Sequence, residues 1–386
     1  MTIQPIYLDN NSTTRVDPAV VEQMLPFLTE TYGNASSVTH LYGQVAAKAV
    51  STAREQVANL LNCETKAIIF TSGATESNNI AIQGVMRASK KGKHLVTNAA
   101  EHKAVLDPAN RLAREGFEVT VLPVDRFGSV SVDDVVHAIR DDTALVSIMH
   151  ANNEVGTVNP IKAIAKQCKK AGVLFHTDAS QTAGKIPIDL SDGLVDLLSL
   201  SAHKYYGPKG IGVLYVRPGS PRIQIEPLVE GGGHERRIRS GTLPVHQIVG
   251  LGAASLLATK NLQIEAASLS TLRERLKLRL MEQIEDVILN GHETQRLPGN
   301  LHISIPGVNS DALMMSLRDH VAMSSGSACT TLSPEPSHVL VAMGVPISLI
   351  ASSLRFGIGR FNTSEEIDTV SDLVAETSKK LRRIRG

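Results

Sequence analysis

The stretch LVDLLSLSAHKYYGPKGIGVLYV, residues 194–216, determines how we interpret the rest of the chain. The apolar runs at 194–200 and 212–216 predict two buried strands, and Ser201, His203 and Lys204 follow the first of them. A lysine is costly to bury unless it is paired or neutral, and an imine to an aldehyde cofactor would commit its amine covalently. The alternative is a surface lysine on a turn, because so short a motif often matches by chance.

Short β-branched runs alternate with helical patterns from about residue 66 onward. This alternation predicts an α/β domain with a mainly parallel, seven-stranded sheet covered by helices on both faces. After about residue 255 a long charged amphipathic stretch leads to isolated strands and a C-terminal helix, which predicts a smaller α+β domain. We expect a large domain at 16–258 and a small domain built from 1–15 and 259–386.

The composition is that of an ordinary globular protein. With Lys+Arg 39 against Asp+Glu 38, the formal net charge of +1 gives no electrostatic reason to expect nucleic acid or an anionic membrane as a partner. No apolar run approaches a membrane span, and MTIQPIYLDNN lacks a basic-then-apolar signal segment, so we expect a cytoplasmic protein. The three cysteines form no CxxC pair, so we expect neither a disulfide framework nor a metal site.

Polar residues follow several of the predicted strands. SGATES (72–77) lies between a strand and a helix, where free N–H groups and hydroxyls could cradle a phosphate or simply cap the helix. Asp178 ends a strand-like run, where it could hold a pyridinium N–H or cap a helix. His102 and Asn153 also follow strand-like runs, and each alone could be a structural polar residue rather than a catalytic one. Because ligands collect beyond the carboxyl ends of strands in open α/β sheets, we expect these residues and Lys204 to share one edge.

In combination these segments resemble the pyridoxal-phosphate enzymes of fold type I, and specifically the cysteine desulfurases that supply sulfur for iron–sulfur clusters. The resemblance runs in the family's order from residue 7 to residue 363 and so covers nearly the whole chain. It implies pyridoxal 5'-phosphate as the cofactor and conversion of L-cysteine to L-alanine. The segments that carry it are YLDNNSTT, TSGATESNN, AEHKAVLDP, MHANNEVG, HTDASQTAGK, SLSAHKYYGPKGIG, GGGHERRIRSGT, SSGSACT and LRFGIGRFNT.

The resemblance also implies roles for the residues around the cofactor ring. Lys204 would hold the cofactor as an imine and later move protons, while His102 would stack on the ring and take part in proton transfer. Asp178 would pair with the pyridine nitrogen and Gln181 with the ring oxygen. Asn153 belongs both to the cofactor-binding and to the substrate-binding set.

At the two ends of the site the resemblance implies binding of a phosphate and of a carboxylate. Arg355 and Asn153 would hold the substrate carboxylate, for which a guanidinium can make a bidentate pair. Thr242 would reach the phosphate from the other subunit, which implies a homodimer with shared active sites. Within one subunit the phosphate would be bound by Ala74, Thr75, Ser201 and His203.

The three cysteines differ in their surroundings. Cys168 shares helical spacing with Ile161 and Ile164, which predicts a core residue, and Cys63 lies at a predicted helix end with no assigned role. Cys329 lies in SSGSACTTLSPEPS, a Gly/Ser/Pro stretch that predicts an accessible loop. It matches the family's persulfide-forming cysteine, so the resemblance makes Cys329 the catalytic nucleophile.

Three alternatives stand beside this interpretation. An aminotransferase of the same fold would need no protein thiol, a selenocysteine lyase is the runner-up within the family, and a non-enzymatic scaffold would not need Lys204, Asp178 and His102. The resemblance implies a sulfur acceptor, which could be an iron–sulfur scaffold, a tRNA-thiolation protein or another carrier. Only 26 residues, 361–386, follow LRFGIGR, whereas some relatives carry a longer tail that docks the scaffold, so we expect docking to use another surface or to be weaker.

Overall fold

The computed structural model describes residues 4–220, 222–325 and 336–385, and Cys329 lies outside the described residues. In the described ranges the strands are β1 (Ile6–Tyr7), β2 (Ile68–Thr71), β3 (His94–Asn98), β4 (Glu118–Leu122), β5 (Thr143–Ser147), β6 (Leu174–Asp178), β7 (Leu197–Ser201), β8 (Gly212–Val216), β9 (Ile288–Leu289), β10 (Asn300–Ser304), β11 (Val321–Ala322), β12 (Ser324–Ser325) and β13 (Ser353–Gly357).

The helices of the same ranges are α1 (Pro18–Met24), α2 (Pro26–Thr29), α3 (Leu41–Leu60), α4 (Ala74–Asn79), α5 (Val85–Ala88), α6 (Lys103–Arg114), α7 (Val132–Ala138), α8 (Ile161–Lys170), α9 (Val245–Gln283), α10 (Ser310–Leu317), α11 (His338–Ala342), α12 (Ile347–Ile350) and α13 (Ser364–Arg385). Short 3-10 or π segments are η1 (Thr65–Ala67), η2 (Ile80–Gly84), η3 (Ala202–Lys204) and η4 (Glu235–Arg237). Among these described helices, none combines the length and the apolar character needed to cross a bilayer.

Seven strands of the described chain form one sheet, in the order β2-β8-β7-β6-β5-β3-β4. The pairs from β7 to β4 are parallel, whereas β8 runs antiparallel to both of its neighbours, so the predicted mainly parallel sheet is confirmed. Because β8 reverses direction between β2 and β7, those two strands point the same way. The carboxyl ends of β2, β7, β6, β5 and β3 therefore meet at one edge.

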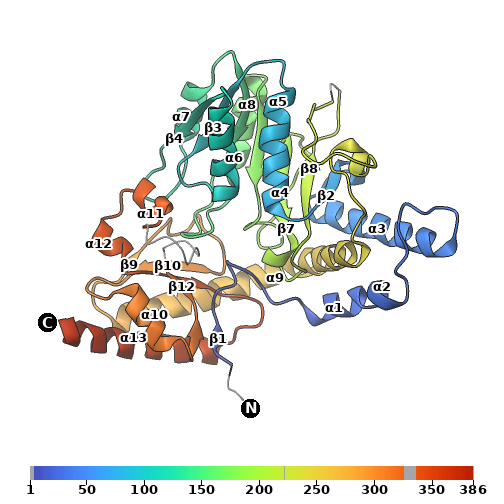
Figure 1. Ribbon diagram of the computed structural model, residues 1–386. Helices are drawn as coiled ribbons and strands as arrows, with labels where there is room; N and C mark the ends of the chain where they lie inside the picture. Colours follow the sequence, from blue (N-terminus) through green and yellow to red (C-terminus); the bar gives the residue numbers. More distant parts are fainter. Residues whose placement is uncertain (1–3, 221, 326–335, 386) are drawn as a thin grey trace.

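Apart from the edge strand β4, the sheet is largely buried on both faces, which explains why strands such as β7 and β8 read as apolar runs. Successive side chains alternate between the faces. Leu197 thus packs in the core that includes Val85 of α5 and Val105 of α6, whereas Leu198 packs in the core built with α3, α8 and the first half of α9. Figure 1 shows α4, α5 and α6 together on one side of this sheet.

A second apolar core lies around the four-stranded sheet β12-β13-β10-β9. Leu301 and Ile303 of β10 and Phe356 of β13 pack there against the second half of α9 and against α13. The N-terminal segment joins this unit, since β1 pairs in parallel with β11 and Asp9 forms an isolated bridge with Gly357. Asn11 and Ser12, which follow this segment, line the cavity described below.

The 39-residue helix α9 connects the two cores. At 1.5 Å per residue it is about 58 Å long, and Figure 1 shows it running from beneath the large sheet to the smaller one. Its residues Val245 to Ala258 pack in the first core and Leu269 to Leu280 in the second. The sequence-based division at 258/259 falls between these two stretches, and we retain it as a proposal.

Acid should destabilise this fold through buried histidines. His176 of β6 and His302 of β10 are fully buried, and burial lowers the pKa of His176 to about 4 and of His302 to about 3. As the pH falls below about 6.5, the unfolded chain binds protons that the folded chain does not, so stability is lost from pH 6.5 downward until the folded pKa is reached. We expect each group to cost on the order of 2 kcal/mol at pH 5.

The midpoint of thermal unfolding, measured between pH 7 and pH 5, tests this expectation. The variant His302→Gln should show a smaller fall in midpoint over this range than the parent protein, whatever its midpoint at pH 7. His137→Gln is the matched control because His137 is exposed. An identical pH dependence in the parent and in His302→Gln would contradict the prediction.

Candidate active site

A cavity of about 670 Å³ opens at the sheet edge where the carboxyl ends of the strands meet. Its wall collects residues that follow five different strands and also residues of the N-terminal segment and of β13. Of the residues predicted from the sequence, the wall includes Ala74, Thr75, His102, Asn153, Asp178, Gln181, Ser201, His203, Lys204 and Arg355. Thr242 does not line the cavity and is exposed in the segment between η4 and α9.

Lys204 lies in η3, directly after the buried strand β7. Its Nζ donates hydrogen bonds to the backbone oxygens of Asn11 (2.8 Å) and Ser12 (2.7 Å). The same turn is fixed to the N-terminal segment because Thr14 N donates to His203 O at 2.9 Å. The amine is therefore held inside the cavity wall rather than on an exposed turn.

Asp178 is the last residue of β6 and is 6% exposed. Asn78 Nδ2 donates to its Oδ2 at 2.7 Å, and both N and Oγ of Ser180 donate to its Oδ1, at 2.9 and 2.5 Å. These donors fix the carboxylate in one orientation at the cavity. They leave lone pairs that can accept a further N–H from a ligand.

His102 is the N-cap of α6, where its Nδ1 accepts a hydrogen bond from Ala104 N at 3.0 Å. The ring lines the cavity, and desolvation by the surrounding walls lowers its pKa, with Lys204 and His338 acting in the same direction. The lowered pKa favours the neutral ring at pH 7. With Nδ1 as acceptor, a neutral ring carries its proton on Nε2.

The part of the cavity wall that contains Gly73, Ala74, Thr75 and Ser201 could form a cradle for an anion. The helical run α4, η2 and α5 begins at Ala74, after Gly73, whose φ of 153° suits glycine. A Cβ built on Gly73 would lie 3.7 Å from Ser201 Oγ and so would occupy the cradle. His203 lies beside it, and burial lowers the pKa of its ring to about 4, with Lys204 adding to the effect. Free N–H groups at a helix start favour anions.

Asn11 and Lys185 were not predicted as site residues, although both belong to segments quoted for the resemblance. Gln181 Nε2 donates to Asn11 O at 2.9 Å, and Asn11 Nδ2 donates to Gln181 Oε1 at 3.2 Å. Lys185 Nζ donates to the same Oε1 at 3.3 Å, and burial, followed by the nearby Lys204, lowers the pKa of Lys185 to about 7. The amide of Gln181 is thus bonded directly to Lys185 and is connected to Lys204 through Asn11 O, which accepts hydrogen bonds from both Gln181 and Lys204.

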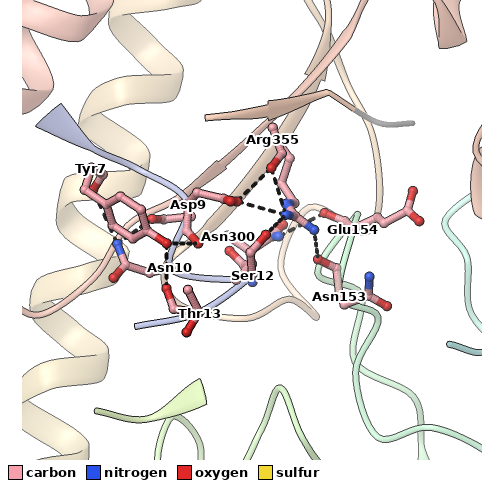
Figure 2. A network of polar contacts seen from close by, with 12 residues as sticks. Tyr7, Asp9, Asn10, Ser12, Thr13, Asn153, Glu154, Asn300 and Arg355 are labelled. Carbon is pink, nitrogen blue, oxygen red and sulfur yellow. Dashed lines mark hydrogen bonds and ion pairs between the residues drawn. The ribbon is translucent and has the colours of Figure 1, made fainter. Parts of the chain in front are cut away.

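Arg355 of β13 enters the cavity from the smaller unit. Figure 2 shows its guanidinium surrounded by oxygen acceptors. Nη2 donates to Asp9 Oδ1 (2.9 Å), Ser12 Oγ (2.6 Å) and Ser324 Oγ (3.1 Å), and Nη1 donates to Asn153 O (3.1 Å). The structure therefore brings Arg355 and Asn153 together, as predicted, and adds Asp9 as an ion-pair partner that the sequence analysis missed.

Two buried carboxyl groups near the cavity were also missed. Glu154 lines the cavity and accepts a hydrogen bond from Ser337 Oγ at 2.5 Å, and burial raises its pKa. Burial likewise raises the pKa of Glu101, whose backbone oxygen lies 2.8 Å from His338 Nε2. Glu101 lies in AEHKAVLDP and Glu154 in MHANNEVG, two of the segments that carry the resemblance. An acidic residue within such a segment was the indication that the sequence offered.

The two cysteines within the described residues are unreactive thiols. Cys168 is fully buried on α8, which confirms the predicted core position, and burial raises the pKa of its thiol to about 12. Cys63 follows α3 and is half-buried, and burial raises its pKa to about 12 as well. A thiol with so high a pKa is almost entirely protonated at neutral pH and is therefore a poor nucleophile.

Comparison with known proteins places this site in a family. The profile of the family "Aminotransferase class-V" matches residues 6–370. The cysteine desulfurase IscS of Salmonella paratyphi B is 52% identical over 381 residues, which is 98% of this chain and 94% of that protein. The chain belongs to the class-V aminotransferase family and, within it, to the cysteine desulfurases.

Solved structures agree with this membership of the cysteine desulfurases. A NifS-like protein superposes with a TM-score of 0.90 at 38% identity, over 97% of this chain and 99% of that one. The NifS-like protein from Rickettsia africae ESF-5 gives a TM-score of 0.84 at 30% identity, again over 97% and 99%. SspA in complex with cysteine gives 0.80 at 35% identity, over 93% and 100%. The fold predicted for this desulfurase is thereby confirmed.

Proposed function

We propose that this desulfurase converts L-cysteine to L-alanine with pyridoxal 5'-phosphate as its cofactor. The observation that carries the proposal is the shared wall of one cavity, which presents the amine of Lys204, the fixed carboxylate of Asp178 and the cradle after Gly73. An amine, a carboxylate and an anion cradle match the aldehyde, the pyridine nitrogen and the phosphate of this cofactor. Within the described residues, no group of three or more His, Cys, Asp or Glu side chains is arranged to hold a metal.

The residues present fit the cofactor at each of its polar ends. Ala74, Thr75, Ser201 and His203 would hold the phosphate, and the cradle has room for it because Gly73 has no Cβ. Asp178 would accept the pyridine N–H, and Gln181 would donate to the ring oxygen. When bound, pyridoxal 5'-phosphate supplies an aldehyde that condenses with amines and a ring that withdraws electrons from the substrate α-carbon.

Lys204 and His102 are the groups placed to move protons. Lys204 would hold the cofactor covalently through Nζ until the substrate amine replaces it, and the freed amine can then take the α-proton. His102, being neutral with its proton on Nε2, can stack against a ring, donate the proton of Nε2 and take a proton back at that atom afterwards. The cavity walls that lower the pKa of His102 also limit the access of water to these steps.

Arg355 and Asn153 would hold the substrate carboxylate at the opposite end of the cavity. A guanidinium gives a charge-assisted, bidentate contact to a carboxylate. One solved relative, SspA, was determined in complex with cysteine, and the present chain is 35% identical to it. That similarity supports an amino acid of this size as the substrate here.

Cys329 would be the nucleophile that removes the sulfur. Its thiolate attacks the substrate sulfur, an S–S bond forms and the Cβ–S bond breaks, with the electron pair left on carbon. Protonation of that carbon yields alanine, and the sulfur stays on Cys329 as a persulfide. Ser325 and His338, which flank residues 326–337 in the sequence, both line the cavity. Cys329 is four residues from Ser325, a separation that extended chain spans in about 14 Å.

We also propose a homodimer in which Thr242 completes the partner's phosphate site. Thr242 is exposed and lies outside its own cavity, as a residue that serves a second subunit must. The exposed apolar side chains of Tyr32, Val38, Leu41 and Tyr42 favour burial against another chain. The cytoplasmic location expected from the sequence stays a prediction.

The persulfide would pass to a sulfur-acceptor protein, either an iron–sulfur scaffold or a tRNA-thiolation protein. The name IscS belongs to the Salmonella relative, and 52% identity to it favours the iron–sulfur scaffold. Formal net charge is close to zero, which gives no reason to expect direct binding of nucleic acid.

Turnover of L-cysteine by the cofactor-loaded protein tests the proposal. With a thiol reductant present we expect equal amounts of alanine and sulfide, and a persulfide on the peptide that contains Cys329 when the reductant is omitted. With a 2-oxo acid added as the amino-group acceptor, conversion of L-cysteine to 3-mercaptopyruvate without alanine or sulfide would support an aminotransferase instead. A protein that binds no pyridoxal 5'-phosphate and releases no alanine would support the scaffold alternative. Turnover of L-selenocysteine but not of L-cysteine would support the selenocysteine lyase.

A further inference from the structure

Asp9 forms an ion pair with Arg355, a residue of the cavity wall, with 2.9 Å between Asp9 Oδ1 and Arg355 Nη2. The side chains are only 19% and 7% exposed, so water screens the pair weakly. Asp9 is fixed by the bridge of its backbone to Gly357 on the strand that carries Arg355. Figure 2 shows the two side chains meeting within a network of oxygen acceptors.

Neutral acceptors hold Arg355 in addition to Asp9. Ser12 Oγ and Ser324 Oγ accept from the same Nη2, and Asn153 O accepts from Nη1. These neutral acceptors approach both terminal nitrogens of the guanidinium. What Asp9 adds beyond them is a negative charge beside the cation.

One N–H group of the Arg355 guanidinium has no acceptor among the described residues. Nε of Arg355 has no hydrogen-bond partner within the part of the chain that the structure describes. A ligand carboxylate at Arg355 would therefore be the second anion on a cation that Asp9 already neutralises. Two carboxylates on one guanidinium repel each other, and the repulsion is strong where water is largely excluded.

We propose that Asp9 weakens the binding of the substrate and product carboxylates to Arg355 and so promotes release of alanine. This inference rests on the proposed function, in which Arg355 holds the carboxylate. It assigns Asp9 no contact with the substrate, because Asp9 acts through Arg355. Without the charge of Asp9, Arg355 would bind a carboxylate more tightly. Alanine carries the same carboxylate as cysteine, so its release would be slower.

The variant Asp9→Asn separates charge from hydrogen bonding. Asparagine Oδ1 can still accept from Arg355 Nη2 and from Ser324 Oγ, which lies 2.9 Å from Asp9 Oδ1. We expect the dissociation constant of L-alanine from the holoenzyme, measured by titration calorimetry, to fall at least about fivefold. Ethylamine has the amine but no carboxylate, so its dissociation constant should stay within about twofold.

Kinetics provides a second readout. The KM for L-cysteine should fall in Asp9→Asn, and kcat should fall or stay constant as alanine release slows. Asp17→Asn is the matched control, because Asp17 pairs with Arg360 at 2.7 Å and neither residue lines the cavity. It should leave the affinities for L-alanine and ethylamine unchanged. Asp9→Ser, which also removes the charge, replaces Asp9→Asn if that variant does not fold.

Unchanged or weaker binding of L-alanine by Asp9→Asn would overturn the proposal. Arg355→Gln distinguishes this failure from a failure of the proposed function. If Arg355→Gln loses L-alanine binding while Asp9→Asn matches the parent protein, only the role of Asp9 is wrong. If Arg355→Gln also binds L-alanine as the parent does, the carboxylate site itself is wrongly placed and both proposals fail together.

Discussion

Replacing Lys204 with alanine should reduce the release of alanine from L-cysteine by ~10³-fold or more, because in the proposed function one amine both attaches the cofactor and moves the α-proton. The structure supports a specific role for this amine, since its Nζ is held by the backbone oxygens of Asn11 and Ser12. An alanine at this position keeps the backbone of η3 while it removes both functions. The absorption band that the cofactor shows when bound to lysine should be lost.

Two variants separate the chemistry of Lys204 from its charge. Lys204→Arg retains a cation but cannot act as an amine near neutral pH, so it should be as inactive as Lys204→Ala. Lys209→Ala removes another lysine of the same cavity wall, one that is exposed, and should keep most of the activity. Activity of Lys204→Arg above one tenth of the parent rate would show that charge rather than amine chemistry is required.

The alternation of strands and helices in the sequence was enough to predict the large sheet and its functional edge. Continuous apolar runs are typical of strands buried on both faces, and polar residues after such runs mark the edge where ligands bind. Asp178, His102 and Lys204 could therefore be placed together from the order of these runs alone. The antiparallel direction of β8 was not predicted. A buried strand has the same apolar pattern whether it runs parallel or antiparallel to its neighbours.

Residues that contribute through the small unit were harder to predict. Asp9, Asn11 and Ser12 follow a strand of two residues, too short to give a periodic signal, and their partners lie more than 150 positions away in the sequence. Glu101 and Glu154 read as ordinary surface acids in loops, yet both are buried. Only the packing of the two units against each other brings Asn11, Ser12 and Glu154 into the wall of one cavity.

Replacing Cys329 with alanine should stop sulfur transfer while the cofactor stays bound. The proposal assigns attachment of the cofactor to Lys204, Asp178 and the cradle after Gly73, all of which are independent of the thiol. Without a nucleophile the Cβ–S bond of the substrate has no acceptor for its sulfur, so alanine release should fall at least about 10²-fold. Titration of the holoenzyme with L-cysteine should still change the absorption of the cofactor, which shows that substrate binds.

Cys63→Ala is the control for this experiment, because Cys63 is half-buried and burial raises its pKa to about 12. It should keep the parent rate to within about twofold, since a protonated thiol is a poor nucleophile. If Cys329→Ala instead releases alanine at the parent rate, no protein persulfide is needed. The cavity would then act directly on the substrate as a lyase, and Arg355, Lys204 and His102 would keep their roles while Cys329 would lose its own.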